Sequence, residues 1–160
     1  MIMAGLDLNK VQEDIENLTQ NIWKKQTEAS AASENSNDET LSILITTIAM
    51  YNSSLGRNAA IAKAIARDMK RAYESLKEDK ETRRAVLTLE YSQDGPVGKA
   101  EARAKVEAAE EFKPLISDAF KVYNEVQLIA DQADDLTYRT DTFLKMSQTR
   151  VSLIKADKKG

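Results

Sequence analysis

The sequence predicts an all-α protein, built as a long helical hairpin with a short helix before it. Apolar residues recur at helical spacing along most of the 160 residues, and only five glycines and two prolines interrupt them. Turn-forming residues gather in two places, near residues 29–38 and 91–98. The hairpin arms are therefore expected at about residues 39–90 and 99–154, after an N-terminal amphipathic helix within residues 1–28.

The N-terminal helix is predicted by apolar residues at alternating spacings of three and four, the pattern of a coiled-coil seam: Leu8, Val11, Ile15, Leu18 and Ile22. Either Asp7 or a capping box of Asn9 and Gln12 can start it, so the helix should begin near residue 8. Residues 29–38 are small and polar and have no apolar period. They predict a flexible linker that leaves this helix semi-detached.

The first arm of the hairpin is expected to start at a capping box formed by Ser36 and Glu39. Gly56 lies inside its apolar pattern and leaves two alternatives, one long helix with a weak point or two helices that meet near residues 53–58. The second arm contains Pro114, which should kink or break the helix near Phe112.

Residues 39–155 form the predicted hairpin domain, and residues 156–160 a basic tail. A hairpin of this length buries one stripe on each helix and leaves further apolar surface exposed. We therefore expect a homo-oligomer larger than a dimer.

The composition excludes several kinds of chemistry. The chain has no Cys and no His, so it lacks thiolate nucleophiles, thiolate metal ligands and the usual general base. We expect a protein that is not an enzyme and needs no cofactor or metal. The first residues have no basic segment followed by an apolar one, and no apolar run is long enough for a membrane span. A soluble, intracellular protein without a membrane partner is expected.

The net charge is only −3, but the charges are unevenly distributed. Residues 57–84 carry nine Lys and Arg against five Asp and Glu, and residues 145–160 carry five against one. One interpretation is a solvated helix face with ion pairs between successive turns. The other is a track that binds nucleic-acid phosphates. Its candidate residues are Arg67, Lys70, Arg71, Lys77, Lys80, Arg83 and Arg84.

Two tyrosines near this basic segment could supply a stacking surface for bases. Tyr73 shares the apolar stripe of the first arm, which favours a role in core packing. Tyr91 lies at the start of the predicted turn.

Part of the chain resembles a known family. Residues 82–96, with the sequence TRRAVLTLEYSQDGP, are followed by an Ala- and Glu-rich segment and by a long helix that ends in residues 139–150, RTDTFLKMSQTR. This order of a basic amphipathic helix, an aromatic residue before a Gly-containing turn, and a long second helix resembles the phage recombination mediators of the UvsY type. The resemblance covers about residues 41–155 and contains no catalytic motif.

The resemblance implies a helical protomer that assembles into a ring-like oligomer in the cytoplasm of a bacterial host. It also implies binding to the backbone of single-stranded DNA and help for a RecA-type recombinase in displacing a single-strand-binding protein. The family's basic residues before the aromatic turn match Arg83 and Arg84, and Lys77 and Lys80 join them by proximity. The N-terminal helix has no counterpart in this pattern.

A different class of function also fits the sequence. The acidic surfaces and the seam over residues 8–22 suit a helical protein-interaction module, such as a phage inhibitor of a host defence complex or a scaffold. Only the DNA-binding interpretation predicts a steep loss of affinity for oligonucleotides as salt rises.

Overall fold

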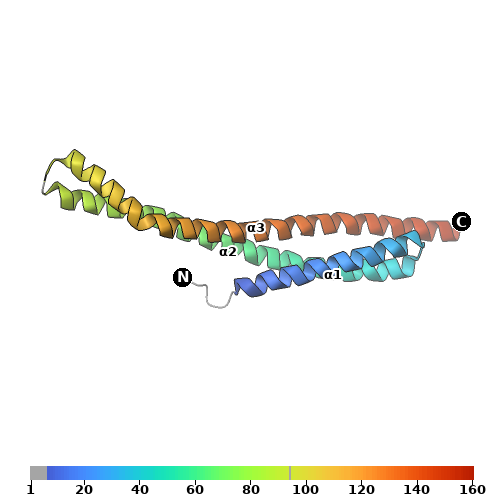
Figure 1. The fold of residues 1–160 in the computed structure, drawn as a ribbon. Coiled ribbons are helices and arrows are strands. Elements are labelled where there is room, and N and C mark those ends of the chain that lie inside the picture. Colours follow the sequence, from blue (N-terminus) through green and yellow to red (C-terminus); the bar gives the residue numbers. More distant parts are fainter. Residues whose placement is uncertain (1–6, 94) are drawn as a thin grey trace. The chain divides into compact units, whose positions relative to one another are not determined.

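The computed structural model describes residues 7–93 and 95–160, which form three α-helices and no strand (Figure 1). The helices are α1 (Leu8–Glu34), α2 (Asp38–Ser92) and α3 (Val97–Lys159). The all-α prediction is confirmed for this part of the chain. Contacts divide the chain into unit 1, which comprises Met1–Lys63 and Leu128–Gly160, and unit 2, which comprises Ala64–Gln127.

Helix α1 starts at Asp7, one of the two alternatives for its cap. The Asp7 carboxylate accepts hydrogen bonds from the backbone N–H groups of Asn9 at 3.0 Å and Lys10 at 3.4 Å. Two otherwise unpaired donors at the helix start are thereby satisfied. Gln12 does not form a capping box, because its side chain donates to Glu16 in the next turn.

The prediction of a flexible linker over residues 29–38 is wrong. Helix α1 continues to Glu34, and Ala29 and Ala32 are buried in the core of unit 1. Alanine has the highest helix propensity, and its small side chain lets a neighbouring helix approach closely. The connection is limited to residues 35–37, and α1 is an integral part of unit 1.

The tight connection between α1 and α2 has a Schellman geometry. Ser36 adopts φ 53°, and its N–H donates to the Ser33 carbonyl at 3.2 Å, while the Asn37 N–H donates to the Ala32 carbonyl at 2.9 Å. The Asn37 side chain then caps α2 by accepting from the Thr40 N–H at 3.1 Å. The predicted capping box of Ser36 and Glu39 is therefore replaced by an Asn37 cap.

Helices α2 and α3 are both continuous at the residues that were expected to weaken or break them. Gly56 lies inside α2, which settles the alternatives in favour of one long helix. A Cβ at Gly56 would lie 3.8 Å from the Thr137 side chain, an ordinary contact distance. Pro114 lies inside α3 and does not end it, so the break is excluded and the kink stays a prediction.

The predicted basic tail is part of α3 rather than a separate segment. The helix continues to Lys159, with Lys158 and Lys159 in its last turn. Cations in the last turn interact favourably with the negative end of the helix dipole.

The core of unit 1 is built by all three helices. In Figure 1, α1 lies alongside α2 and α3 in this unit. The largest fully buried side chains of its apolar core are Ile22 from α1 and Leu41, Ile48 and Leu55 from α2. Polar contacts also fix the alignment of α2 along α3. Asn52 donates to the Thr137 carbonyl at 3.2 Å and to the Asp141 carboxylate at 2.9 Å.

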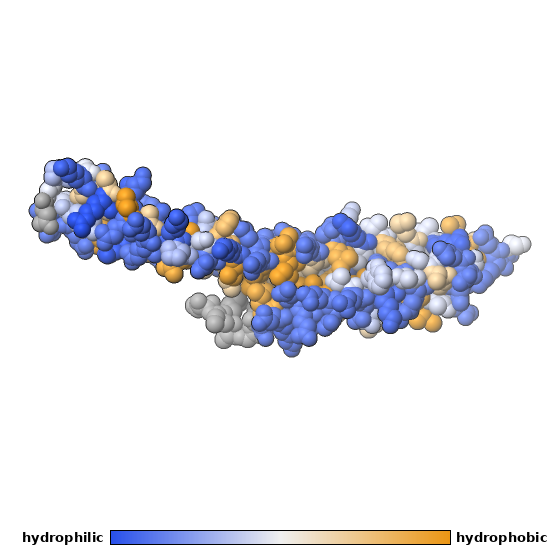
Figure 2. Space-filling model, viewed as in Figure 1, coloured by the Kyte–Doolittle hydropathy of each residue, from blue (hydrophilic) through white to orange (hydrophobic). Residues whose placement is uncertain are grey.

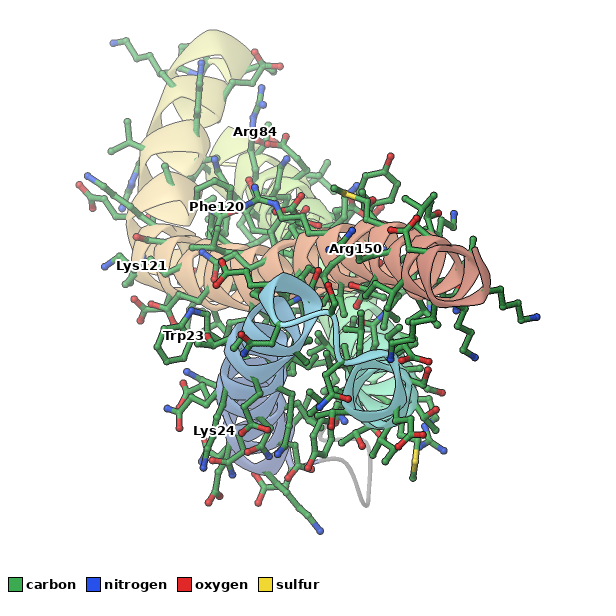
Figure 3. The ribbon with its side chains drawn as sticks, turned by 90° about the vertical axis from the view of Figure 1, so that its right-hand side faces the viewer. Trp23, Lys24, Arg84, Phe120, Lys121 and Arg150 are labelled. Carbon is green, nitrogen blue, oxygen red and sulfur yellow. The ribbon has the colours of Figure 1, made fainter. Side chains whose placement is uncertain are left out.

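The ends of the three helices are also tied together in unit 1. Arg150 of α3, labelled in Figure 3, donates to the Ser33 carbonyl at the end of α1 at 3.2 Å. Lys158 donates to Asp38 at the start of α2. These contacts satisfy carbonyl and carboxylate groups that the helix ends would otherwise leave to water.

Unit 2 is an antiparallel pair formed by α2 and α3 and has a much smaller apolar core. One of its buried clusters consists of Leu87, Ala104 and Ala108, with Tyr91 packed against them. Other apolar side chains of this unit are also buried, namely Ile65, Ala66, Ala100 and Val126. The face of this unit seen in Figure 2 is mainly hydrophilic. Within the described residues, no helix has an apolar stretch long and uncharged enough to cross a membrane.

Candidate functional site

The seven basic candidate residues all lie on the part of α2 that belongs to unit 2, but their surroundings differ. Lys70, Lys77 and Arg84 are seven residues apart and follow one line along the helix. Lys80 lies between Tyr73 and Leu87 at the same spacing, which is a seam position facing α3. The candidates therefore do not share a single face.

Arg83 connects the two helices of unit 2. Its guanidinium Nε lies 3.3 Å from a carboxylate oxygen of Glu111 on α3. Arg84 instead pairs with Glu81 on its own helix at 3.2 Å. Arg83 must give up an interhelical ion pair to bind a phosphate, whereas Arg84 must give up only a pair between neighbouring turns.

The candidates nearer the start of this segment form local ion pairs. Arg71 lies 3.5 Å from Asp68, and Lys70 lies 3.9 Å from Glu74, both on α2. Arg67 also has an interaction partner. The pairs of Lys70 and Arg71 are of the kind expected on a solvated helix face, and exposed pairs of this kind contribute at most about 1 kcal/mol.

A groove between α2 and α3 brings aromatic and basic side chains together. The rings of Tyr73 and Phe120 lie 5.4 Å apart between centroids, and the Lys77 ammonium lies 4.9 Å from the Tyr73 ring. The groove next to them has a volume of about 450 Å³. Its lining consists of Tyr73, Lys80, Ala109, Lys113, Ile116, Ser117 and Phe120.

The two lysines of the groove come from opposite helices and have the same charge. Neither Lys80 nor Lys113 forms an ion pair with a carboxylate within residues 7–93 and 95–160. A helix seam normally places apolar side chains at the position of Lys80. An anion in the groove would be attracted by both ammonium groups, and the Ser117 hydroxyl offers it a further donor.

At least one face of the Tyr91 ring is already occupied and cannot stack with a base. Its hydroxyl donates to the Glu107 carboxylate, and the Arg103 guanidinium lies 4.1 Å from the centre of its ring. The hydrogen bond to Glu107 raises the pKa of Tyr91 above its ordinary value. Tyr91 thus holds α2 to α3 near the turn.

The residues that α3 contributes to the groove were not predicted from the sequence. Lys113, Ile116, Ser117 and Phe120 come from α3 and line the groove together with Tyr73 and Lys80 of α2. Which side chains two helices bring together depends on their antiparallel register, which in unit 2 also brings Arg83 to Glu111. Periodicity along a single helix leaves this register open.

Comparisons with models of protein families, with characterised proteins and with solved structures find no match for this chain.

Proposed function

We propose that this chain binds single-stranded DNA as a recombination mediator of the UvsY kind and helps to load a RecA-type recombinase against a single-strand-binding protein. The observation that carries the DNA-binding part is the groove of unit 2, where Lys80 and Lys113 have no counter-ion among the described residues and lie beside the Tyr73–Phe120 pair.

Each part of the groove suits one part of a nucleotide. The two ammonium groups and the Ser117 hydroxyl suit a phosphate, which releases condensed counterions when it binds. The Phe120 ring is 45% exposed and can stack with a base of any sequence. The groove would bind the backbone of the DNA and would accept strands of different base sequence.

Basic residues outside the groove play a secondary part in this mechanism. Arg84 and Lys77 lie on the same line of α2 and extend the positive potential of the groove along the helix. One groove is a small site, so useful affinity requires several protomers on one strand, where weak contacts add by multivalency.

The test replaces both groove lysines. The variant Lys80→Ala/Lys113→Ala should bind single-stranded oligonucleotides more weakly than wild type, and by about the same factor for unrelated sequences. The slope of log affinity against log salt concentration should become less steep by about 0.7 for each lost phosphate contact. The matched control, Lys10→Ala/Lys24→Ala, removes the same charge from exposed positions of α1 and should keep the wild-type slope. Equal affinity of wild type and groove variant would exclude this groove as the DNA site.

A protein-interaction module is the second candidate, and unit 1 provides a specific reason. Trp23 is 71% exposed on α1, and Tyr138 is 73% exposed on α3 (Figure 3 labels Trp23). Exposed aromatic residues are enriched where proteins bind other proteins. This candidate predicts that oligonucleotide affinity is weak and that the groove variant does not change it.

A further inference from the structure

The outer face of α2 in unit 1 carries a second seam. Residues at spacings of four, three, four, three and four lie on the side of the helix that faces away from the core, and we call them the outer seam: Glu39, Ile43, Thr46, Met50, Ser53 and Arg57. All six are exposed, and Ile43 and Met50 are each 68% exposed. This alternation is the one by which α-helices pair with other helices.

The outer seam is uncharged except at its two ends. Residues 40–56 contain no Asp, Glu, Lys or Arg, although 31% of the chain is charged. The Thr46 hydroxyl donates to the Ser42 carbonyl at 3.2 Å, and the Thr47 hydroxyl donates to the Ile43 carbonyl at 3.1 Å. Because these hydroxyls are used within the helix, the threonines contribute mainly methyl groups to the surface.

We propose that the outer seam binds the same seam of a second copy, in antiparallel orientation. Glu39 and Arg57 lie nine residues on either side of Ile48, so a two-fold axis there brings Glu39 of one copy to Arg57 of the other, twice. Within the described residues neither side chain has an ion pair, and Arg57 donates only to Ser54. A parallel pair would place like charges together instead.

The sizes of the side chains support the same pairing. About the same axis, Ile43 faces Ser53 of the second copy, and Met50 faces Thr46. Each large side chain thus meets a small one, as interlocking helices require. The interface is self-complementary in charge and in shape, and its occupant is a second copy of this chain rather than a different protein.

Charge exchange tests the orientation. Glu39→Arg or Arg57→Glu alone should weaken self-association about tenfold, because both end contacts become repulsive. The exchanged variant Glu39→Arg/Arg57→Glu should recover the wild-type association constant. All three variants change exposed residues, and their melting temperatures report whether the fold is kept. Equal association of all four proteins, measured by analytical ultracentrifugation, would overturn the proposal.

Cysteine cross-linking gives a second test, since the chain has no native Cys. An equimolar mixture of Ile43→Cys and Ser53→Cys should form disulfide-linked dimers on oxidation. Ile43→Cys alone should not, because in the antiparallel pair the two copies of residue 43 lie about 15 Å apart along the helix. Cross-linking of Ile43→Cys alone would indicate a parallel pair, and absence of cross-links in the mixture would exclude this interface. Neither outcome depends on DNA binding, so this test is independent of the proposed function.

Discussion

Ser36 is a residue whose backbone conformation suits a different side chain. Its φ of 53° is in the left-handed region, where a residue with a Cβ costs about 1–2 kcal/mol and glycine does not. We expect Ser36→Gly to raise the free energy of unfolding by about 1 kcal/mol. Chemical denaturation measures the change.

The matched control is the same substitution three residues earlier. Ser33 lies inside α1, where glycine should lower the free energy of unfolding by about 0.5 kcal/mol. A loss of stability in both variants would contradict the Schellman geometry at the end of α1.

Asp38 provides a contact in unit 1 that depends on pH. Its hydrogen bond with Lys158 lowers its pKa below the ordinary value of 3.8, although burial acts in the opposite direction. The stabilisation is therefore present above the ordinary pKa and is lost as the pH falls through the lowered value. Melting curves of wild type and Asp38→Asn should differ at neutral pH and converge in strong acid. A difference that stays constant with pH would show that the ion pair contributes nothing.

At the scale of the elements, α1 is a structural helix rather than an appendage. Ile22 is fully buried and Trp23, the next residue, is 71% exposed. We expect Ile22→Ala to lower the free energy of unfolding by about 2–5 kcal/mol, because it leaves a cavity in the core of unit 1. Trp23→Ala should change stability by at most about 0.5 kcal/mol. Denaturant titrations of both variants check this, and equal small effects would mean that α1 detaches in solution.

Lys80 and Lys113 place two charged side chains in the otherwise largely apolar lining of the groove in unit 2. Replacing both by Leu would extend the apolar contact between α2 and α3. We expect Lys80→Leu/Lys113→Leu to raise the melting temperature and to weaken oligonucleotide binding. Thermal denaturation and a binding titration on the same preparation measure both. A lower melting temperature would show that the lysine stems pack better than leucine does.

At the scale of the whole molecule, two surfaces have separate roles in the proposed assembly. The groove of unit 2 would hold single-stranded DNA, and the outer seam would join copies of unit 1 in pairs. One two-fold contact gives only a dimer, so the expected larger oligomer needs a second interface. We expect light scattering with size exclusion at micromolar concentration to report a mass above that of a dimer for wild type. A monomer under these conditions would contradict the expected oligomer.

The helical class, the turn near residues 91–98 and the boundaries of the hairpin arms to within a few residues were predictable from the sequence. These features depend on local properties, namely apolar period, glycine and proline content, and capping residues. The linker was mispredicted because Ala29 and Ala32 continue the three- and four-residue spacing of the N-terminal seam with small side chains, in a segment otherwise rich in Ser and Asn. Such small residues are buried only when other helices lie against them.

Only the part of the candidate site that lies on α2 was predicted, because the other side of the groove is formed by α3. The basic segment and the place of Tyr73 on an apolar stripe can be read from the residues of α2 alone. The contact of Arg83 with Glu111, 28 residues away, and the position of Lys80 and Lys113 beside one groove depend on how α2 packs against α3. The reason is physical: whether a charged side chain is neutralised depends on the register of two helices, and local periodicity leaves that register open by one residue.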